Sequence, residues 1–234
     1  TNLRSQSPCY QTFLQVLDQK KADWVELANL DCPYIELPET IEDLHARYSK
    51  NHRKNLKKQK NKLLRLHEVE FERVDQTLEL QEAVDLLFDL HNKRHGSSSV
   101  FYSDQNKAFF LTLSKLFQQK RFLRIYAVKI NKEYAAIIYG FSFNDRFLDY
   151  QGGYDPAWYD LRVKKILLHH VVESQINQSV AVFDMGRGAE AYKLEWTKDI
   201  ALTKDFLIFA GSGFYFLHKA QTLCRNLIKR LIRR

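Results

Sequence analysis

FDMGRGAEAYKLEW, residues 183–196, joins the end of an apolar strand to a loop with two glycines and then to a Tyr-Lys pair. Residues 180–183 are apolar, so we expect the strand to end at the carboxylate of Asp184. Glycine lets a ligand approach the backbone closely, and α/β proteins place their sites in loops that follow strands. This stretch is therefore where a functional site is expected.

The residues around this stretch predict a mixed sheet. An antiparallel meander is expected over 122–130, 133–143 and 146–150, because alternating apolar segments are separated by Asn-Lys and Asn-Asp turns. A helix over 163–175 then leads to a strand over 180–184, which is expected to lie parallel to the third meander strand. The fold class predicted is α+β, with a mixed, mostly antiparallel sheet flanked by helices.

Further elements are expected on both sides of this unit. Helices are predicted over 8–20, 40–47, 49–66, 75–95, 103–120 and 214–232. Thr40 is predicted as an N-cap, Ser49 as the start of its helix, and either Ser103 or Asp104 as the start of the helix that ends near residue 120. Strands are predicted over 24–27, 34–37, 67–74 and 202–209.

Composition limits the class of protein. The 234 residues are 45% hydrophobic with a formal net charge of +8, which is typical of a globular chain with a basic surface that favours polyanions. Cys9, Cys32 and Cys224 lie far apart, so neither a disulfide framework nor a cysteine-based zinc site is expected. No apolar run is long enough to span a membrane, and a reducing, cytoplasmic location is the simplest expectation.

Four phrases resemble the GNAT-fold acyltransferases, most closely the CelD-type acetyltransferase domains, which are related to the Fem-type aminoacyl transferases. They are SKNHRKNL (49–56), LHNKR (90–94), YQGGYD (150–155) and DMGRGAEAYK (184–193). The resemblance covers residues 34–234 and implies a GNAT fold for them. Such proteins carry two GNAT-like halves, so residues 1–33 are interpreted as the stub of a missing first half.

The resemblance implies an N-acyltransferase that moves an acyl group from acyl-CoA, typically acetyl-CoA, to an amine. The acceptor implied is a small molecule, such as an amino sugar, or another cell-envelope or polysaccharide precursor. The residues assigned to catalysis are Asp184, Lys193, Tyr192 and His91. Asp184 has an equal alternative as a cap of the turn that follows it. For His91, a packed boundary residue is the preferred interpretation over a catalytic base.

The donor site shows one departure from the family pattern. The turn before the helix at 163 is LRVKK (161–165) and has no glycine, although such a turn binds the pyrophosphate of the donor through backbone N–H groups. Either side-chain charge substitutes for that contact, or CoA binding has been lost, or the donor is a different molecule. The residues predicted to bind the donor are Arg162, Lys164, Lys165, Gln151, Gly152 and Gly153, and those predicted to bind the acceptor are Arg53, Arg94, Tyr154, Asp155 and Arg187.

No metal site is expected. His169 and His170 are adjacent on one predicted helix, and a metal would need more ligands at suitable spacing. Packing is therefore the preferred interpretation of both.

Two other functions remain open. The segment 47–65 has nine Lys or Arg and no acid, so it could bind tRNA, as in a Fem-like transferase that uses aminoacyl-tRNA, or an anionic lipid. DNA is not among the expected partners. The other alternative is a non-catalytic GNAT-like binding module. The basic terminal helix either packs on the sheet or makes peripheral contact with the inner membrane surface.

Overall fold

The computed structural model describes residues 3–4, 7–27, 30–96, 99, 103–209, 213–216 and 218. The chain forms two compact units. The main unit comprises residues 33–186 and 190–199, and the second unit comprises residues 1–32, 187–189 and 200–234. Among the described residues, no helix combines the length and the apolar character that a membrane span requires.

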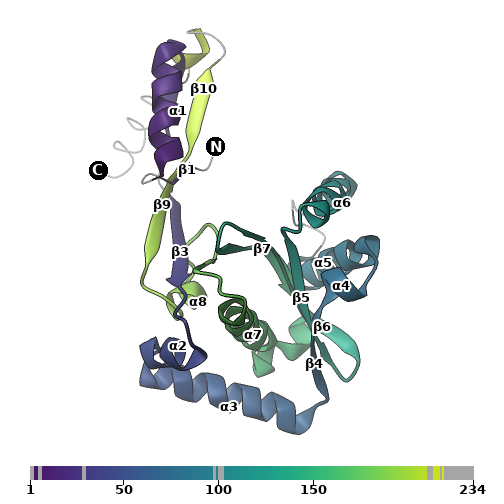
Figure 1. Ribbon diagram of the computed structural model, residues 1–234. Coiled ribbons are helices and arrows are strands. Elements are labelled where there is room, and N and C mark those ends of the chain that lie inside the picture. The colour runs from purple at the N-terminus through teal and green to yellow at the C-terminus, as the bar shows by residue number, and fades with distance from the viewer. Residues whose placement is uncertain are drawn as a thin grey trace, which may run out of the picture. The chain divides into compact units, whose positions relative to one another are not determined.

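The main unit is built on a mixed sheet (Figure 1). Its strands lie in the order β3-β8-β7-β6-β5-β4. Neighbours are antiparallel except β7 and β8, which are parallel, so the predicted meander and the parallel return strand are confirmed. The strands are β3 (Leu30–Glu36, of which residues 33–36 belong to this unit), β4 (Val69–Arg73), β5 (Leu123–Ile130), β6 (Glu133–Phe143), β7 (Arg146–Tyr154) and β8 (Val182–Asp184).

Helices cover both faces of this sheet. The predicted caps are confirmed, since the hydroxyls of Thr40, Ser49 and Ser103 each accept a hydrogen bond from a backbone N–H in the first turn. The helices of the main unit are α2 (Ile41–Arg47), α3 (Lys50–Leu66), α4 (Val74–Thr77), α5 (Leu80–His95), α6 (Asp104–Gln119), the 3₁₀ helix η1 (Pro156–Leu161), α7 (Val163–Asn177) and α8 (Ala191–Leu194).

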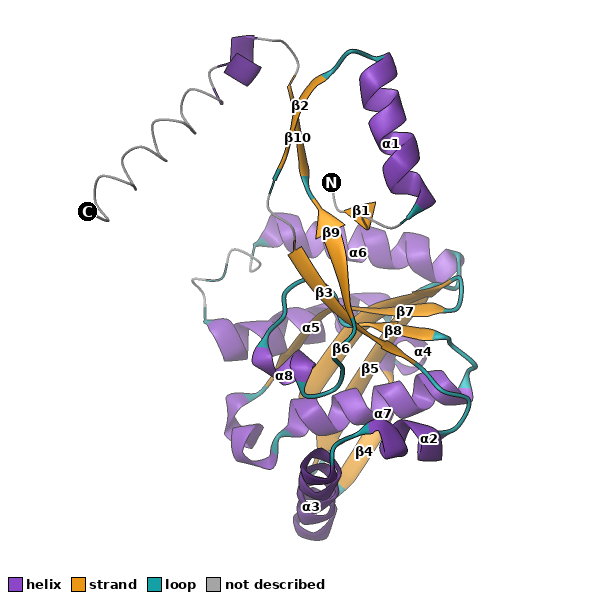
Figure 2. Ribbon diagram, turned by 90° about the vertical axis from the view of Figure 1, so that its left-hand side faces the viewer, coloured by secondary structure: helices purple, strands orange, loops and turns teal. Residues whose placement is uncertain are grey.

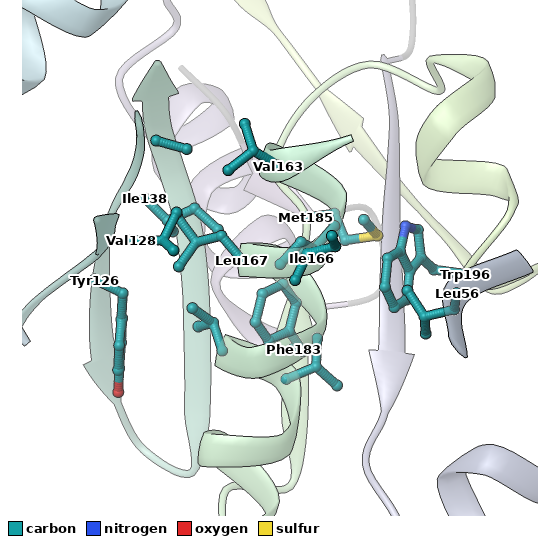
Figure 3. Packing of buried hydrophobic residues seen from close by; sticks show 14 of the residues in the cluster. Leu56, Tyr126, Val128, Ile138, Val163, Ile166, Leu167, Phe183, Met185 and Trp196 are labelled. Carbon is teal, nitrogen blue, oxygen red and sulfur yellow. The ribbon is translucent and has the colours of Figure 1, made fainter. Parts of the chain in front are cut away.

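The core follows the alternation of the strands. On β5, Tyr126 and Val128 point toward α7 and α3, whereas Ile125 and Ala127 point toward α5 and α6. Figure 2 shows the sheet between these two helical layers. On the α7 side, Ile166 and Leu167 belong to one buried cluster with Phe183 and Met185 (Figure 3). Burial of these apolar side chains holds the helices against the two faces of the sheet.

Strand β7 is longer than predicted, and this is a correction. The sequence placed Gly152 and Gly153 in a loop after residue 150, but both lie in β7, which continues to Tyr154. An added Cβ at Gly153 would lie 2.4 Å from the backbone nitrogen of His91. Glycine is therefore needed because α5 packs directly on the strand, not because the chain turns.

Two other element boundaries differ from the prediction. The helix expected over 75–95 is interrupted, and α5 begins after Glu79, whose side chain forms a capping box with Glu82. The strand expected over 202–209 is two strands, β9 (Ile200–Lys204) and β10 (Phe206–Phe209).

Those two strands belong to the second unit, in which β9 pairs with β1 (Leu3–Arg4) and β10 pairs with β2 (Asp23–Glu26). Helix α1 (Pro8–Gln19) starts at Ser7, and its Tyr10 and Phe13 contact Phe206 of β10. The helix predicted over 214–232 falls, except for 214–216 and 218, outside the described residues. The interpretation of residues 1–33 as a stub stays a prediction.

Strands β7 and β8 part soon after they meet. Their pairing spans Arg146 to Leu148 on β7 and Val182 to Asp184 on β8. Beyond Leu148, β7 continues to Tyr154 while β8 ends. Tyr150 is an extra residue there, since Asp149 and Gln151 pair with consecutive residues of β6. Such a bulge turns a strand locally. β7 runs on past the end of β8 with no ladder partner on that side among the described strands, and this unpaired part of β7 is called the wedge.

Candidate functional site

A cavity of about 1100 Å³ lies in the main unit near this wedge. Five segments line it: the end of β3, the end of α2 with the start of α3, the end of α5, the chain from Tyr154 through η1 to the first turns of α7, and Tyr192 with residues 194–199. A cavity of this size suits a substrate of some tens of atoms.

The first turn of α7 faces the cavity. Arg162, Val163, Lys164 and Lys165 all line it, and Arg162 has no side-chain cap bond. The backbone N–H of Lys165 donates to the carbonyl of Arg162, so the N–H groups of Val163 and Lys164 precede the first bond of the helix. An open helix N-terminus attracts anions because its N–H groups and the helix dipole both present positive charge.

Arg162 takes the place of the missing glycine. Its φ is 54° and its ψ is 37°, the left-handed conformation that glycine adopts without strain. Its guanidinium lies 4.8 Å from the centre of the Tyr159 ring. The turn before α7 therefore keeps its shape without glycine, and the side chain adds a cation at the helix N-terminus.

The lining of the cavity is basic. It includes six Lys or Arg side chains and three acidic ones. Of the predicted site residues, Arg94 and Tyr154 also line it, with the Arg94 guanidinium 5.1 Å from the centre of the Tyr154 ring. Lys165 is paired with Glu195. The excess of cations favours an anionic ligand.

A cluster of buried charges lies where the two strands part. Asp149 of β7 is buried, and burial raises the pKa of its carboxyl although Lys164 and Lys193 act against this. Burial lowers the pKa of Lys164, whose main charged neighbour is Asp149. An added Cβ at Gly152 would lie 3.0 Å from Nζ of Lys164, so the glycine leaves room for this ammonium group. Asp149 and Lys164 are therefore a pair whose opposite charges stabilise each other.

Tyr192 lines the cavity beside this pair. Burial raises the pKa of its hydroxyl, and the negative charges of Asp149 and Glu190 raise it further. The hydroxyl therefore stays protonated and able to donate.

Lys193 and Asp184 lie outside the lining. Lys193 is buried and forms an ion pair with Glu190, with 2.9 Å between Nζ and Oε2. Asp184 is buried too, and its Oδ1 accepts a hydrogen bond of 3.1 Å from the N–H of Gly186. Its Oδ2 lies 3.6 Å from Arg146. The structure thus places Asp184 as a cap of the turn, the alternative to a catalytic role.

His91 packs behind β7. Its Nε2 lies 3.1 Å from the hydroxyl of Ser99, and burial lowers the pKa of its ring. Gln151 bonds to its own strand, since its Oε1 accepts from the N–H of Gly152. None of His91, Gln151, Gly152 and Gly153 lines the cavity.

Three more predicted residues are not brought to the cavity. Arg53 is exposed on α3. Asp155 caps η1 by accepting from the N–H of Ala157 and pairs with Lys93 at 2.7 Å. Arg187 belongs to the second unit, where it pairs with Asp205 at 2.8 Å.

Sequence reasoning missed Asp149 and the aromatic wall of the cavity, formed by Tyr48, His52 and Trp196. The rings of Tyr48 and His52 each meet Trp196 edge-on. An acid on the inward face of an apolar strand was a usable signal for Asp149, because such acids are rare. The wall comes from segments far apart in the chain, so no local pattern reveals it.

Comparison with known proteins gives the family. The Acetyltransferase (GNAT) domain family matches residues 50–194. A search of curated proteins found no match.

Three solved structures share the fold. One is a conserved protein of unknown function from Bacteroides thetaiotaomicron, with 13% identity, a TM-score of 0.58, and coverage of 86% of this chain and 67% of the other. The second is the C-terminal domain of a protein from Agrobacterium fabrum described as a lysylphosphatidylglycerol synthetase, with 8% identity, a TM-score of 0.58, and coverage of 91% and 69%. The third is FemX, with 9% identity, a TM-score of 0.59, and coverage of 92% and 72%. At these identities the likeness shows the fold alone.

The order of strands, the parted β7–β8 pair and the matched residues 50–194 agree with one another, and the chain belongs to the acetyltransferase (GNAT) domain family.

Proposed function

We propose that this protein is an N-acyltransferase that transfers an acyl group from acyl-CoA to an amine. One observation carries the proposal: the basic cavity meets the open N-terminus of α7 beside the wedge between β7 and β8. This arrangement holds a phosphorylated donor at one end and leaves room for an acceptor.

The donor's phosphates are assigned to the first turn of α7. The N–H groups of Val163 and Lys164 and the guanidinium of Arg162 converge there. Phosphate oxygens accept bonds from both kinds of donor, and an arginine fork binds them in a fixed geometry.

The chemistry is assigned to the buried cluster. In the transfer the amine nitrogen attacks the thioester carbon, a C–N bond forms, the C–S bond breaks and one proton leaves the nitrogen. We assign the acceptance of this proton to the carboxylate of Asp149, whose pKa is raised by burial. The protonated hydroxyl of Tyr192 donates to the leaving sulfur.

The acceptor proposed is an amino group of a sugar or another cell-envelope precursor. The four phrases that resemble CelD-type domains support it. A cytoplasmic location agrees with that acceptor and with a CoA donor.

A second candidate is transfer from aminoacyl-tRNA, favoured by α3. Lys50, Arg53, Lys54, Lys57 and Lys58 are exposed on this helix, which contains no acid, while its Ser49 cap, Asn55 and Gln59 line the cavity. Such a row of cations matches a polyanion, and tRNA binding there would weaken steeply with salt.

Calorimetry separates these functions. We expect CoA and acetyl-CoA to bind the purified chain, with binding weakened in Arg162→Gln and retained in Arg53→Gln. Binding of aminoacyl-tRNA that is lost in Arg53→Gln, without any binding of CoA, would replace the first proposal with the second. A third outcome is a chain that binds CoA, acylates no amine in a screen of amino sugars and peptides, and keeps its affinity for CoA in Tyr192→Phe. Such a chain would be a binding module.

A further inference from the structure

A cluster of two histidines and a glutamate lies between α2 and α7, outside the lining of the cavity. His45 comes from α2, and His169 and Glu173 come from successive turns of α7. We propose that these three side chains bind a divalent transition-metal ion of the zinc type, which ties α2 to α7.

The ligand atoms have the spacing of a metal site. The two Nε2 atoms of His45 and His169 lie 3.0 Å apart, and Nε2 of His45 lies 3.5 Å from Oε1 of Glu173. All three ligand atoms lie within 4.8 Å of one another. Zinc binds imidazole nitrogen and carboxylate oxygen at about 2.0–2.2 Å, so neighbouring ligand atoms of a tetrahedral site lie about 3.3 Å apart. Small adjustments suffice to complete three-point coordination.

The helical spacing supports the same geometry. His169 and Glu173 are four residues apart, so both project from one face of α7 toward α2. Nδ1 of His169 lies 3.4 Å from Oε2 of Glu173, the second oxygen of the same carboxylate. The carboxylate of Glu173 therefore lies within reach of both imidazoles.

The surroundings also suit a metal ion. The His45 side chain is 42% exposed, so an ion can enter from solvent. Lys60 lies 3.9 Å from Glu173, and its exposed ammonium can turn away.

The choice of metal follows from the donor set. Two imidazoles and one carboxylate, with no thiolate, match zinc and its neighbours in the first transition row, whereas magnesium and calcium prefer oxygen ligands alone. The alternative is a direct hydrogen bond between two neutral imidazoles, with Glu173 serving to orient them. The experiment decides between the two.

Untagged protein, treated with chelator and dialysed, is titrated with ZnCl₂ by calorimetry. We expect one equivalent of zinc to bind. His45→Gln and Glu173→Gln, which change partly exposed side chains and keep their size, each weaken binding by at least about tenfold. The matched control is His170→Gln, because His170 stacks on Phe71 with 4.2 Å between ring centres and is not part of the cluster.

Thermal unfolding gives a second readout. Saturating zinc raises the Tm of the wild type and of His170→Gln, but not that of His45→Gln, because only an intact site couples binding to folding. A wild type that binds no zinc, or binds it equally well in all three variants, overturns the metal site. The cluster lies outside the lining of the cavity. A wild type that binds no zinc is therefore still expected to bind CoA, so the two proposals are tested separately.

Discussion

Arg162 shows how one residue serves backbone and ligand together. The turn before α7 needs a left-handed residue, and Arg162 adopts that conformation although it carries a side chain. An L-residue there costs about 1–2 kcal/mol relative to glycine. Its guanidinium, stacked on Tyr159, supplies a charge that glycine lacks. The conformation and the charge can be separated by substitution.

Arg162→Gly is expected to change the free energy of unfolding by less than about 1 kcal/mol, because relief of strain offsets the lost stacking. The same variant binds CoA more weakly. Arg162→Val keeps the strain and adds a β-branched side chain, so it loses about 1–2 kcal/mol. Urea unfolding and calorimetry measure the two effects. Equal stability of the two variants would contradict strain at this position.

Tyr192 is the residue whose removal tests the chemistry. Tyr192→Phe is expected to lower kcat by about 10²-fold, the usual contribution of a proton donor, with little change in the Kd for CoA. Tyr159→Phe is the control, because Tyr159 also lines the cavity but contacts Arg162 through its ring face. Because the pKa of Tyr192 is raised, its hydroxyl remains protonated and does not limit the rate up to about pH 10.

At the scale of elements, β7 joins the sheet to the site. Its first residues pair with β8, and its bulge at Tyr150 turns the strand. Gly153 leaves room for the backbone of α5, and Gly152 leaves room for the ammonium group of Lys164. Contacts on both faces therefore position the strand. A substitution that shifts β7 is expected to shift the residues at the wedge as well.

Gly153→Ala is expected to destabilise the protein by about 1–3 kcal/mol, because the added methyl would overlap the backbone of α5 at Leu90 and His91. Gly213→Ala is the control, since no atom of the described residues lies within 4 Å of its added Cβ. Chemical denaturation of both variants tests this. Wild-type stability of Gly153→Ala would mean that α5 does not pack this closely.

The capped start of η1 gives a test by pH. A hydrogen bond from Lys93, helped by the N–H of Ala157, holds the pKa of Asp155 below its usual value. A carboxyl with a lowered pKa in the folded state stabilises the fold above its unfolded pKa, and this is lost as the pH falls through the folded value.

Asp155→Asn keeps the cap and removes the charge. It is expected to cost less than about 1 kcal/mol at pH 7, because Lys93 is largely exposed, and the cost should disappear in acid once the carboxyl of wild-type Asp155 is protonated. Unfolding measured from neutral to acidic pH should show the curves of the variant and the wild type converge. Curves of Asp155→Asn and wild type that stay apart at low pH would contradict the ion pair.

At the scale of the main unit, charge and cavity coincide. The net basic lining lies at the N-terminus of α7 and extends toward the exposed cations of α3. A phosphorylated donor is therefore recognised by charge as well as by fit, and charge is screened by salt.

CoA binding is expected to weaken several-fold between about 0.05 and 0.5 M NaCl, as screening shortens the reach of the lining cations. Pantetheine, which lacks the phosphates, is expected to show no such dependence. Calorimetry with both ligands makes the comparison. A salt-independent Kd for CoA would place its phosphates away from this lining.

The sequence alone determined the meander, the parallel return strand, the caps at Thr40, Ser49 and Ser103, and the cations at the start of α7, because each depends on local periodicity or on neighbouring residues. Only the tertiary structure decided which acid lies at the wedge. In the sequence Asp149 is one of several residues on inward strand positions, and the folded chain distinguishes it because α7 brings Lys164 close to it. It likewise decided that Gly152 and Gly153 belong to a strand, and that His45 meets His169 across 124 positions of sequence. These outcomes depend on packing between segments distant in the chain, which no local pattern encodes.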